Sequence, residues 1–181
     1  MARSDRLPDR LREGLDIVSI GINPSLYTVE RGFNFARRSN RFWPTFNACG
    51  LVPQPLEPGI AAVRTLLETY RIGFTDLVAR PTARADELTE ADYRAGTRTL
   101  RRKLMKYRPA IAWFQGVSAF QKYLEHAEGV RRRVTPGLQP ETDTAIVTPA
   151  ASSSAKNASW VRSLKAGTPA SFPASVTRST K

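Results

Sequence analysis

The sequence predicts an α/β fold in which a parallel sheet is covered by helices on both faces. Short apolar runs at 16–22, 110–114 and 145–147 have the length and composition of buried strands. Segments with the apolar spacing of helices lie between these runs. The chain of 181 residues has the length of one domain with a substantial core.

In the first part of the chain, each element is bounded by a local signal. The first strand should end at Pro24, because proline cannot continue a sheet ladder. A loop is expected at 26–38, and Ser39 can then cap a helix over 40–48. Residues 1–14 are polar and charged, and they are expected to form a tail or a short helix.

The longest expected helix spans 89–107, because Tyr93, Leu100 and Leu104 recur on one face at helical spacing. Most of its basic side chains lie outside this stripe and are expected to face solvent. On either side of it, the sequence predicts a helix at 59–70, a strand or extended segment at 72–78, a helix at 117–126 and an edge strand at 130–134.

Composition narrows the class of protein. Lys and Arg number 28 and Asp and Glu 16, and the net charge of +12 favours a polyanionic partner such as nucleic acid. The alternative is a basic protein from an arginine-rich proteome that binds no nucleic acid. The single cysteine, Cys49, excludes an internal disulfide, and the single histidine, His126, excludes a two-histidine metal motif.

The two ends of the chain are expected to lie outside the core. No apolar run approaches the length of a membrane span and no signal-peptide core follows the N-terminus, so we expect an intracellular protein. Residues 166–181 are rich in Ala, Ser, Thr and Pro and are expected to form a flexible tail. The folded domain is therefore expected at 15–165.

Polar residues cluster after three of the expected strands. In open α/β sheets, ligands bind at the carboxyl ends of the strands. The loops expected at that edge are 21–35, 75–81 and 149–157. The sequence therefore predicts that these three loops form a site.

The same loops carry three blocks in a distinctive order. The first combines Gly-Ile-Asn-Pro-Ser at 21–25 with Gly-Phe-Asn-Phe-Ala at 32–36 and Asn-Arg-Phe-Trp at 40–43. The second is Gly-Phe-Thr-Asp-Leu-Val-Ala-Arg-Pro-Thr at 73–82, and the third is Ser-Ser-Ser-Ala-Lys-Asn-Ala at 152–158. Together they resemble the mismatch-specific uracil/thymine-DNA glycosylases of the uracil-DNA glycosylase superfamily.

This resemblance implies both a fold and an activity. The fold is a three-layer α/β/α domain with a short, mainly parallel central sheet. The activity is a hydrolase reaction of base-excision repair, in which uracil, or thymine or another damaged base, is flipped from mismatched double-stranded DNA and its N-glycosidic bond is cleaved. The resemblance implies no metal and no organic cofactor.

Two residues are predicted to be catalytic. By resemblance, Asn23 positions the attacking water, which an amide can do only by hydrogen bonding. Asp76 could act as a general base or stabilise the cationic sugar. The alternatives are a turn-forming asparagine before Pro24 and a capping or turn aspartate.

The resemblance also implies a base-binding set. Phe35 is expected to stack on the flipped base, the alternative being core packing beside Phe33. Backbone amides near Ile22 and Ser25, together with the side chain of Ser152, are expected to read the base edge. Tyr27 and Thr28 are expected to set the size of the pocket.

A third set is expected to contact DNA outside the pocket. By resemblance, Lys156 inserts into the gap left by the flipped base, the alternative being a phosphate contact. Asn157 is placed to read the opposite base. Arg37, Arg38, Arg41 and Arg162 are candidates for phosphate contacts.

We therefore expect a monomeric, cytoplasmic bacterial DNA glycosylase, held at the nucleoid through its DNA substrate. The alternative from another class is a basic DNA-binding module on a degenerate glycosylase scaffold. A further alternative, an α/β enzyme acting on free nucleotides, is disfavoured because the chain lacks a Gly-x-x-x-x-Gly-Lys phosphate loop.

Overall fold

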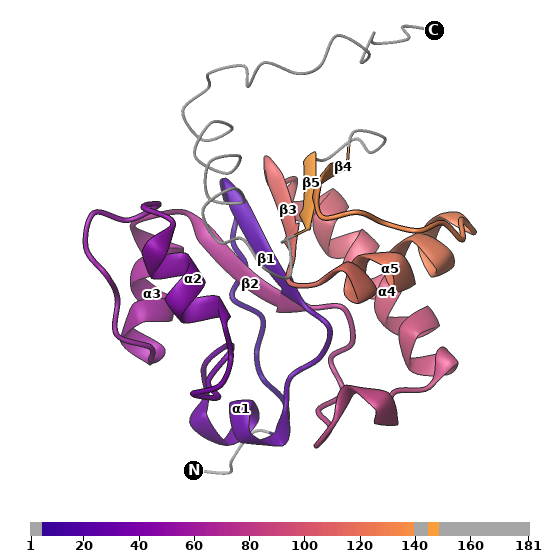
Figure 1. Ribbon diagram of the computed structural model, residues 1–181, viewed down its shortest axis with the longest axis horizontal. Helices are drawn as coiled ribbons and strands as arrows, with labels where there is room; N and C mark the ends of the chain where they lie inside the picture. The colour runs from indigo at the N-terminus through magenta and orange to yellow at the C-terminus, as the bar shows by residue number, and fades with distance from the viewer. Residues whose placement is uncertain (1–4, 140–144, 149–181) are drawn as a thin grey trace, which may run out of the picture.

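The computed structural model describes residues 5–139 and 145–148. Within them, five strands form one sheet in the order β2-β1-β3-β5-β4 (Figure 1). Neighbouring strands run parallel, except that β4 is antiparallel to β5. The mainly parallel sheet predicted from the sequence is thus confirmed. The strands are β1 (Ile17–Gly21), β2 (Ile72–Asp76), β3 (Ile111–Phe114), β4 (Gly137–Gln139) and β5 (Ala145–Thr148).

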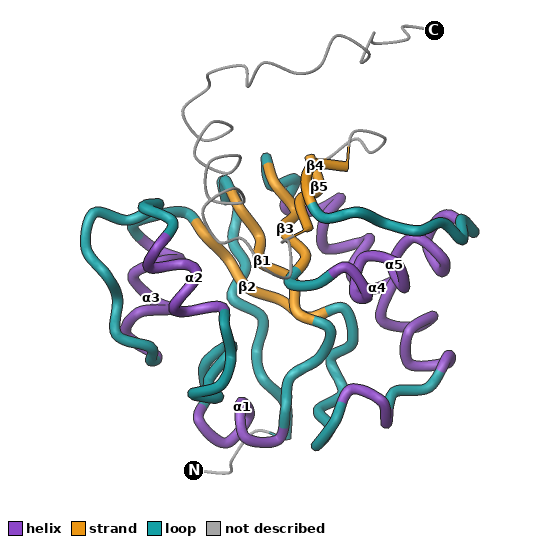
Figure 2. The backbone as a smooth tube through the Cα atoms, in the orientation of Figure 1, coloured by secondary structure: helices purple, strands orange, loops and turns teal. Residues whose placement is uncertain are grey.

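Helices cover both faces of the sheet, and the α/β/α prediction is confirmed (Figure 2). Ile17 and Ile72 belong to the core on the face covered by α2 and α3. Val18 and Phe114 belong to the core on the opposite face, beneath α4 and α5. The helices are α1 (Leu26–Arg31), α2 (Phe42–Ala48), α3 (Ile60–Glu68), the 3₁₀ turn η1 (Ala85–Glu87), α4 (Glu90–Tyr107) and α5 (Val117–Glu128).

Helix α4 begins and packs as its sequence predicts. The Thr89 hydroxyl accepts a hydrogen bond from the Asp92 amide, and the Asp92 carboxylate accepts one from the Thr89 amide, which forms a capping box. Gly96 faces the segment after β2, where a Cβ would lie 2.3 Å from the Leu77 carbonyl oxygen. Among the described helices, none is long and apolar enough to cross a membrane.

The segment after β1 contains a helix where a loop was expected at 26–38. The Ser25 hydroxyl accepts a hydrogen bond from the Thr28 amide at 3.1 Å and caps α1. Gly32 ends the helix in the left-handed conformation, with φ of 73°. The prediction missed α1 because it is short and leaves Leu26 exposed, so it has no clear apolar face.

Two other boundaries differ from the prediction. Helix α2 begins at Phe42, and its N-cap residue is Arg41, not Ser39, with no hydrogen bond from the cap side chain. The Phe42 amide donates instead to the side-chain oxygen of Asn40 at 2.8 Å. The prediction of an edge strand at 130–134 is wrong, because that segment has no strand conformation. The strand at this edge of the sheet, beside β5, is β4.

The N-terminal segment is not a tail or a short helix over its described part. Arg10 pairs with Phe74 in an antiparallel bridge, in which each amide donates to the other residue's carbonyl at 2.8 and 2.9 Å. Gly73 permits this approach, since a Cβ there would lie 2.6 Å from the Arg10 carbonyl oxygen. The segment therefore extends the sheet beside β2 and reaches its carboxyl end.

Candidate active site

A small pocket of about 110 Å³ lies at the carboxyl ends of β1 and β2. Leu7, Asn34 and Asn40 form part of its wall. The predicted site residues that line it are Asn23, Ser25, Thr28, Phe35, Arg37 and Asp76. The fold thus brings the two predicted catalytic residues and the predicted stacking residue into one cavity from three separate segments.

The Asn23 amide is held in one orientation. Its Nδ2 donates to the Thr82 hydroxyl at 2.7 Å, to the Arg80 carbonyl at 3.1 Å and to the Pro24 carbonyl at 3.3 Å. Carbonyl oxygens only accept hydrogen bonds, so the NH₂ group must face them. Oδ1 is therefore the atom of this amide available to accept a hydrogen bond from a water or ligand.

The loop that holds Asn23 is itself fixed on both sides. Thr82 bridges to Ser25 like a short parallel strand, with the Leu26 amide donating to the Thr82 carbonyl at 3.1 Å. On its other side, the Arg80 guanidinium makes a two-bond pair with the Asp92 carboxylate at 3.0 and 2.8 Å. The first turn of α4 therefore supports the position of Asn23.

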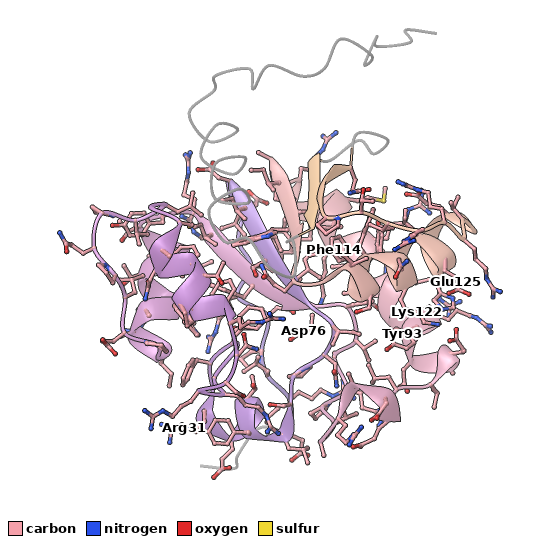
Figure 3. All side chains as sticks on the ribbon, in the orientation of Figure 1. Arg31, Asp76, Tyr93, Phe114, Lys122 and Glu125 are labelled. Atoms are coloured by element: carbon pink, nitrogen blue, oxygen red, sulfur yellow. The ribbon has the colours of Figure 1, made fainter. Side chains whose placement is uncertain are left out.

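Asp76 ends β2 and lies partly buried in the pocket wall (Figure 3). Its pKa is raised from 3.8 to about 7, chiefly because burial disfavours the charged carboxylate. The negative charge of Asp9 also raises this pKa, and Lys103 opposes the rise. Within the described chain, Asp76 caps no helix, so the capping alternative is wrong.

Gly21 makes room for Asp76. The two residues are partners across β1 and β2, and a Cβ at position 21 would lie 2.2 Å from Asp76 Oδ1. A side chain there could be accommodated only if the carboxylate moved away. The glycine of the first sequence block is therefore a steric requirement of the site.

Behind Asp76, a polar cluster ties the N-terminal segment to the sheet and α4. Lys103 forms an ion pair with Asp9 at 2.7 Å, and its ammonium also donates to the Thr75 hydroxyl at 3.1 Å. The Thr75 hydroxyl donates to Asp9 at 2.6 Å. These contacts fix the charges that act on Asp76.

Phe35 combines a strained backbone with an aromatic contact. Its φ is 59°, a left-handed conformation that is unusual for an aromatic residue. Its ring stacks on Phe42 with centroids 4.4 Å apart and meets Phe74 edge-on. Phe35 thus packs against the core cluster that contains Phe33, as the alternative expects, and it also lines the pocket.

Two of the predicted pocket residues are engaged in structural bonds. The Ser25 hydroxyl caps α1 and donates to the Thr28 hydroxyl at 3.0 Å. Thr28 is buried within α1 and reaches the pocket wall. Arg37 Nε lies 3.5 Å from the Ser25 oxygen at the rim of the pocket.

Other predicted residues lie outside the pocket wall. Tyr27 is exposed on α1 with the guanidinium groups of Arg31 and Arg37 near its ring, so its placement does not fit the expected role in pocket size. The Ile22 side chain packs against the core beneath α4, although its carbonyl accepts from the Val78 amide. Arg38 and Arg41 are exposed and do not line the pocket. The predicted site residues Ser152, Lys156, Asn157 and Arg162 lie outside the described residues.

Sequence reasoning missed several contributors. Thr82 and Arg80 belong to the second block, but only the contact with Asn23 reveals what they do. Leu7 and Asp9 were assigned to a tail, because a single strand-like bridge leaves no periodic signal. Asn34 belongs to the first block, but its sequence context does not indicate that it lines the pocket.

One group of possible metal ligands occurs in the described chain, on α4 and α5. Oxygen and nitrogen atoms of Glu90, Glu125 and His126 lie within 4.8 Å of one another. The Lys122 ammonium is paired with both carboxylates, so it already supplies the positive charge there (Figure 3). This cluster shares no lining residue with the pocket that contains Asn23 and Asp76.

Comparison with known protein families agrees with this arrangement. The sequence model of the Uracil DNA glycosylase superfamily matches residues 8–170, which is most of the chain. The match includes the N-terminal segment beside β2 and every residue of the pocket wall except Leu7.

Proposed function

The chain belongs to the uracil DNA glycosylase superfamily, and we propose that it removes uracil from mismatched double-stranded DNA. Members of this superfamily are N-glycosylases, and membership indicates DNA glycosylase activity. The observation that carries the finer proposal is the pocket that brings together Asn23, Phe35 and Asp76. An amide acceptor can position a water, an aromatic face can stack on a flipped base, and a carboxylate can act as a general base.

In the proposed reaction, water replaces the base on the sugar. Asn23 Oδ1 accepts a hydrogen bond from the water and directs the oxygen lone pair to C1′. The bond from C1′ to the base nitrogen breaks, and its electron pair leaves with the base as an anion. The new bond joins the water oxygen to C1′, and Asp76 in its ionised form accepts the proton that the water loses.

The pKa of Asp76 suits this role. A general base works best when its pKa is close to the working pH, and burial brings the Asp76 pKa to about 7. While ionised, the carboxylate also stabilises the positive charge that develops on the sugar, as in other glycosidic cleavages. Phe35 would stack on the base, and backbone amides near Ile22 and Ser25 would stabilise the departing anion.

We propose that DNA approaches over the exposed surface formed by Arg37 at the rim of the pocket and by Arg38 and Arg41 nearby in the chain. These side chains are exposed near the pocket, and the net charge of +12 favours a polyanion. Uracil opposite guanine is the proposed substrate, and thymine and other damaged bases define the range to be tested. We propose that the protein acts as a monomer in the bacterial cytoplasm.

The experiment is a cleavage assay on end-labelled duplexes. Duplexes with one G·U, G·T, xanthine or etheno-cytosine site are incubated with the protein and then treated with alkali. The proposal predicts strand breaks at the G·U site and none in a matched duplex without the lesion. Retarded but unbroken duplexes would favour the alternative, a DNA-binding module without catalysis.

A further inference from the structure

We propose that Asn34 reads the flipped base, with its side-chain oxygen accepting a hydrogen bond from an N–H of the pyrimidine. This inference rests on the proposed function, because it identifies a recognition residue of the same pocket. It starts from a polar atom that the protein leaves without a partner. Asn34 lines the pocket and is only 3% exposed, and its Oδ1 is buried with no hydrogen-bond donor in the structure.

An unpartnered buried acceptor destabilises a folded protein, so its presence in a ligand pocket calls for an explanation. Three amides line this pocket. The NH₂ group of Asn23 is bonded to the loop at 80–82, and the oxygen of Asn40 is bonded to the Phe42 amide. The proposed reaction assigns Asn23 Oδ1 to the attacking water, so Asn34 Oδ1 is the buried acceptor of this pocket that has neither a bond nor a role in that reaction.

The backbone at this position is firmly held. The indole Nε1 of Trp43 donates to the Asn34 carbonyl at 3.2 Å. Phe33 on one side is buried in the core, and Phe35 on the other has the left-handed backbone described above. The residue is thus fixed in place, while rotation about its terminal side-chain bond remains soft.

The chemistry of the free acceptor specifies its partner. An oxygen acceptor needs an N–H or O–H donor, and an amide adds a donor beside it. The Watson–Crick edge of uracil presents an N3–H between two carbonyl oxygens. Asn34 Oδ1 can accept from N3–H while Nδ2 donates to the adjacent carbonyl, which is the two-bond pattern by which amides read base edges.

The test compares uracil with a base that lacks the N3 hydrogen and the 4-oxygen. Non-cleavable 2′-fluorinated duplexes carry either uracil or 2-pyrimidinone opposite guanine. In 2-pyrimidinone, N3 has no hydrogen and the 4-oxygen is missing, so the base is smaller and creates no clash. Dissociation constants are measured for the wild type, Asn34→Leu and Asn34→Ala. The second variant covers the case in which leucine does not fit.

The matched control is Asn47→Leu. Asn47 donates to the Leu56 carbonyl and accepts from the Leu56 amide, and it does not line the pocket. We expect Asn47→Leu to lower the melting temperature and to leave the preference for uracil unchanged. We expect Asn34→Leu to reduce the preference for uracil without lowering the melting temperature, because it removes an unpaired acceptor and not a structural bond.

The wild type should bind the uracil duplex about tenfold more tightly than the 2-pyrimidinone duplex, and both Asn34 variants should reduce this preference to about twofold or less. An equal preference in wild type and variants, or no preference in the wild type, would overturn the inference. A parallel assay with cleavable uracil separates the two proposals. Wild-type protein that prefers uracil but releases none would contradict the catalysis and still support the reading by Asn34.

Discussion

Two aspartates that lie near opposite ends of the same loop have opposite electrostatic environments. Asp76, at the end of β2, has a pKa raised to about 7 because it is removed from water beside another carboxylate. Asp92, in the first turn of α4, has a pKa held well below its usual range, chiefly by its two-bond pair with Arg80 and then by hydrogen bonds from Thr89. One carboxylate is thus poised to exchange a proton and the other is fixed as a charge.

The difference separates the part of the molecule that carries out chemistry from the part that supports it. Around Asp76, the pocket also contains a left-handed aromatic residue, Phe35, and an unpaired acceptor on Asn34. Such features cost stability, and proteins retain them at functional sites. Around Asp92, the capping box and the Arg80 pair stabilise α4 and hold the loop that orients Asn23.

The largest expected effect lies on the chemical side of this comparison. Asn23→Ala should lower the single-turnover rate of uracil excision by roughly 10³-fold, because the water loses its directing acceptor. Duplex affinity should change by no more than a few-fold, as the residue holds water and not DNA. Full excision activity in this variant would remove Asn23 from the mechanism.

Asp76→Asn should lower the excision rate by about 10²-fold. Wild-type activity should rise as the pH rises through about 7, where the carboxylate ionises, and the variant should lack this acidic limb. The pH–rate profile of each protein from pH 5 to 9 measures the difference. Superimposable profiles would mean that Asp76 does not exchange the proton.

Thermal unfolding of the same variant sharpens the comparison between the two aspartates. Because the pKa of Asp76 is raised, its contribution to stability is complete below about pH 4 and is lost as the pH rises through about 7. The difference in melting temperature between Asp76→Asn and wild type should therefore shift in favour of the variant as the pH rises from about 4 to about 7, and it should be larger at pH 8 than at pH 5. The contribution of Asp92 has the opposite sign, because a lowered pKa gives stability that is lost as the pH falls below about 4.

Thr82 connects the two regions and should give an intermediate effect. Thr82→Val keeps the shape but removes the hydroxyl that accepts from Asn23 at 2.7 Å, and it should slow excision by about tenfold. Thr82→Ser keeps the hydroxyl and should retain most of the rate. Equal rates for Val and Ser variants, measured in single-turnover reactions, would show that the hydroxyl does not position Asn23.

The smallest effect on activity is expected at Thr89. Thr89→Ala removes the cap of α4 and should lower the free energy of unfolding by about 1 kcal/mol. The excision rate of the folded protein should stay within about twofold of wild type, because the Arg80–Asp92 pair is retained. Denaturant unfolding and the duplex assay together check both expectations.

The sequence predicted the elements whose signals are local. The buried strands β1 and β3 are short apolar runs, and α4 has both a capping box and a regular apolar stripe. It also predicted that Asn23 and Asp76 would share a site, because both follow parallel strands. It did not predict the strand-like pairing of Arg10 with Phe74, since one bridge leaves no periodic pattern.

The electrostatic environment of the site also could not be predicted from the sequence. The pKa of Asp76 depends on its burial and on Asp9 and Lys103, which are distant in the chain and meet only in the folded protein. The orientation of Asn23 likewise depends on a carbonyl 57 positions away, at Arg80. Such contacts follow from tertiary packing and have no signature in local composition.

The most direct test of the central claim is to measure free uracil and alkali-labile strand in the same reaction. A G·U duplex is incubated with excess wild-type protein, and both products are quantified over time. Glycosylase action at this pocket predicts that free uracil and abasic strand appear at the same rate and in equal amounts. Duplex that is bound by the protein but yields neither product would contradict it.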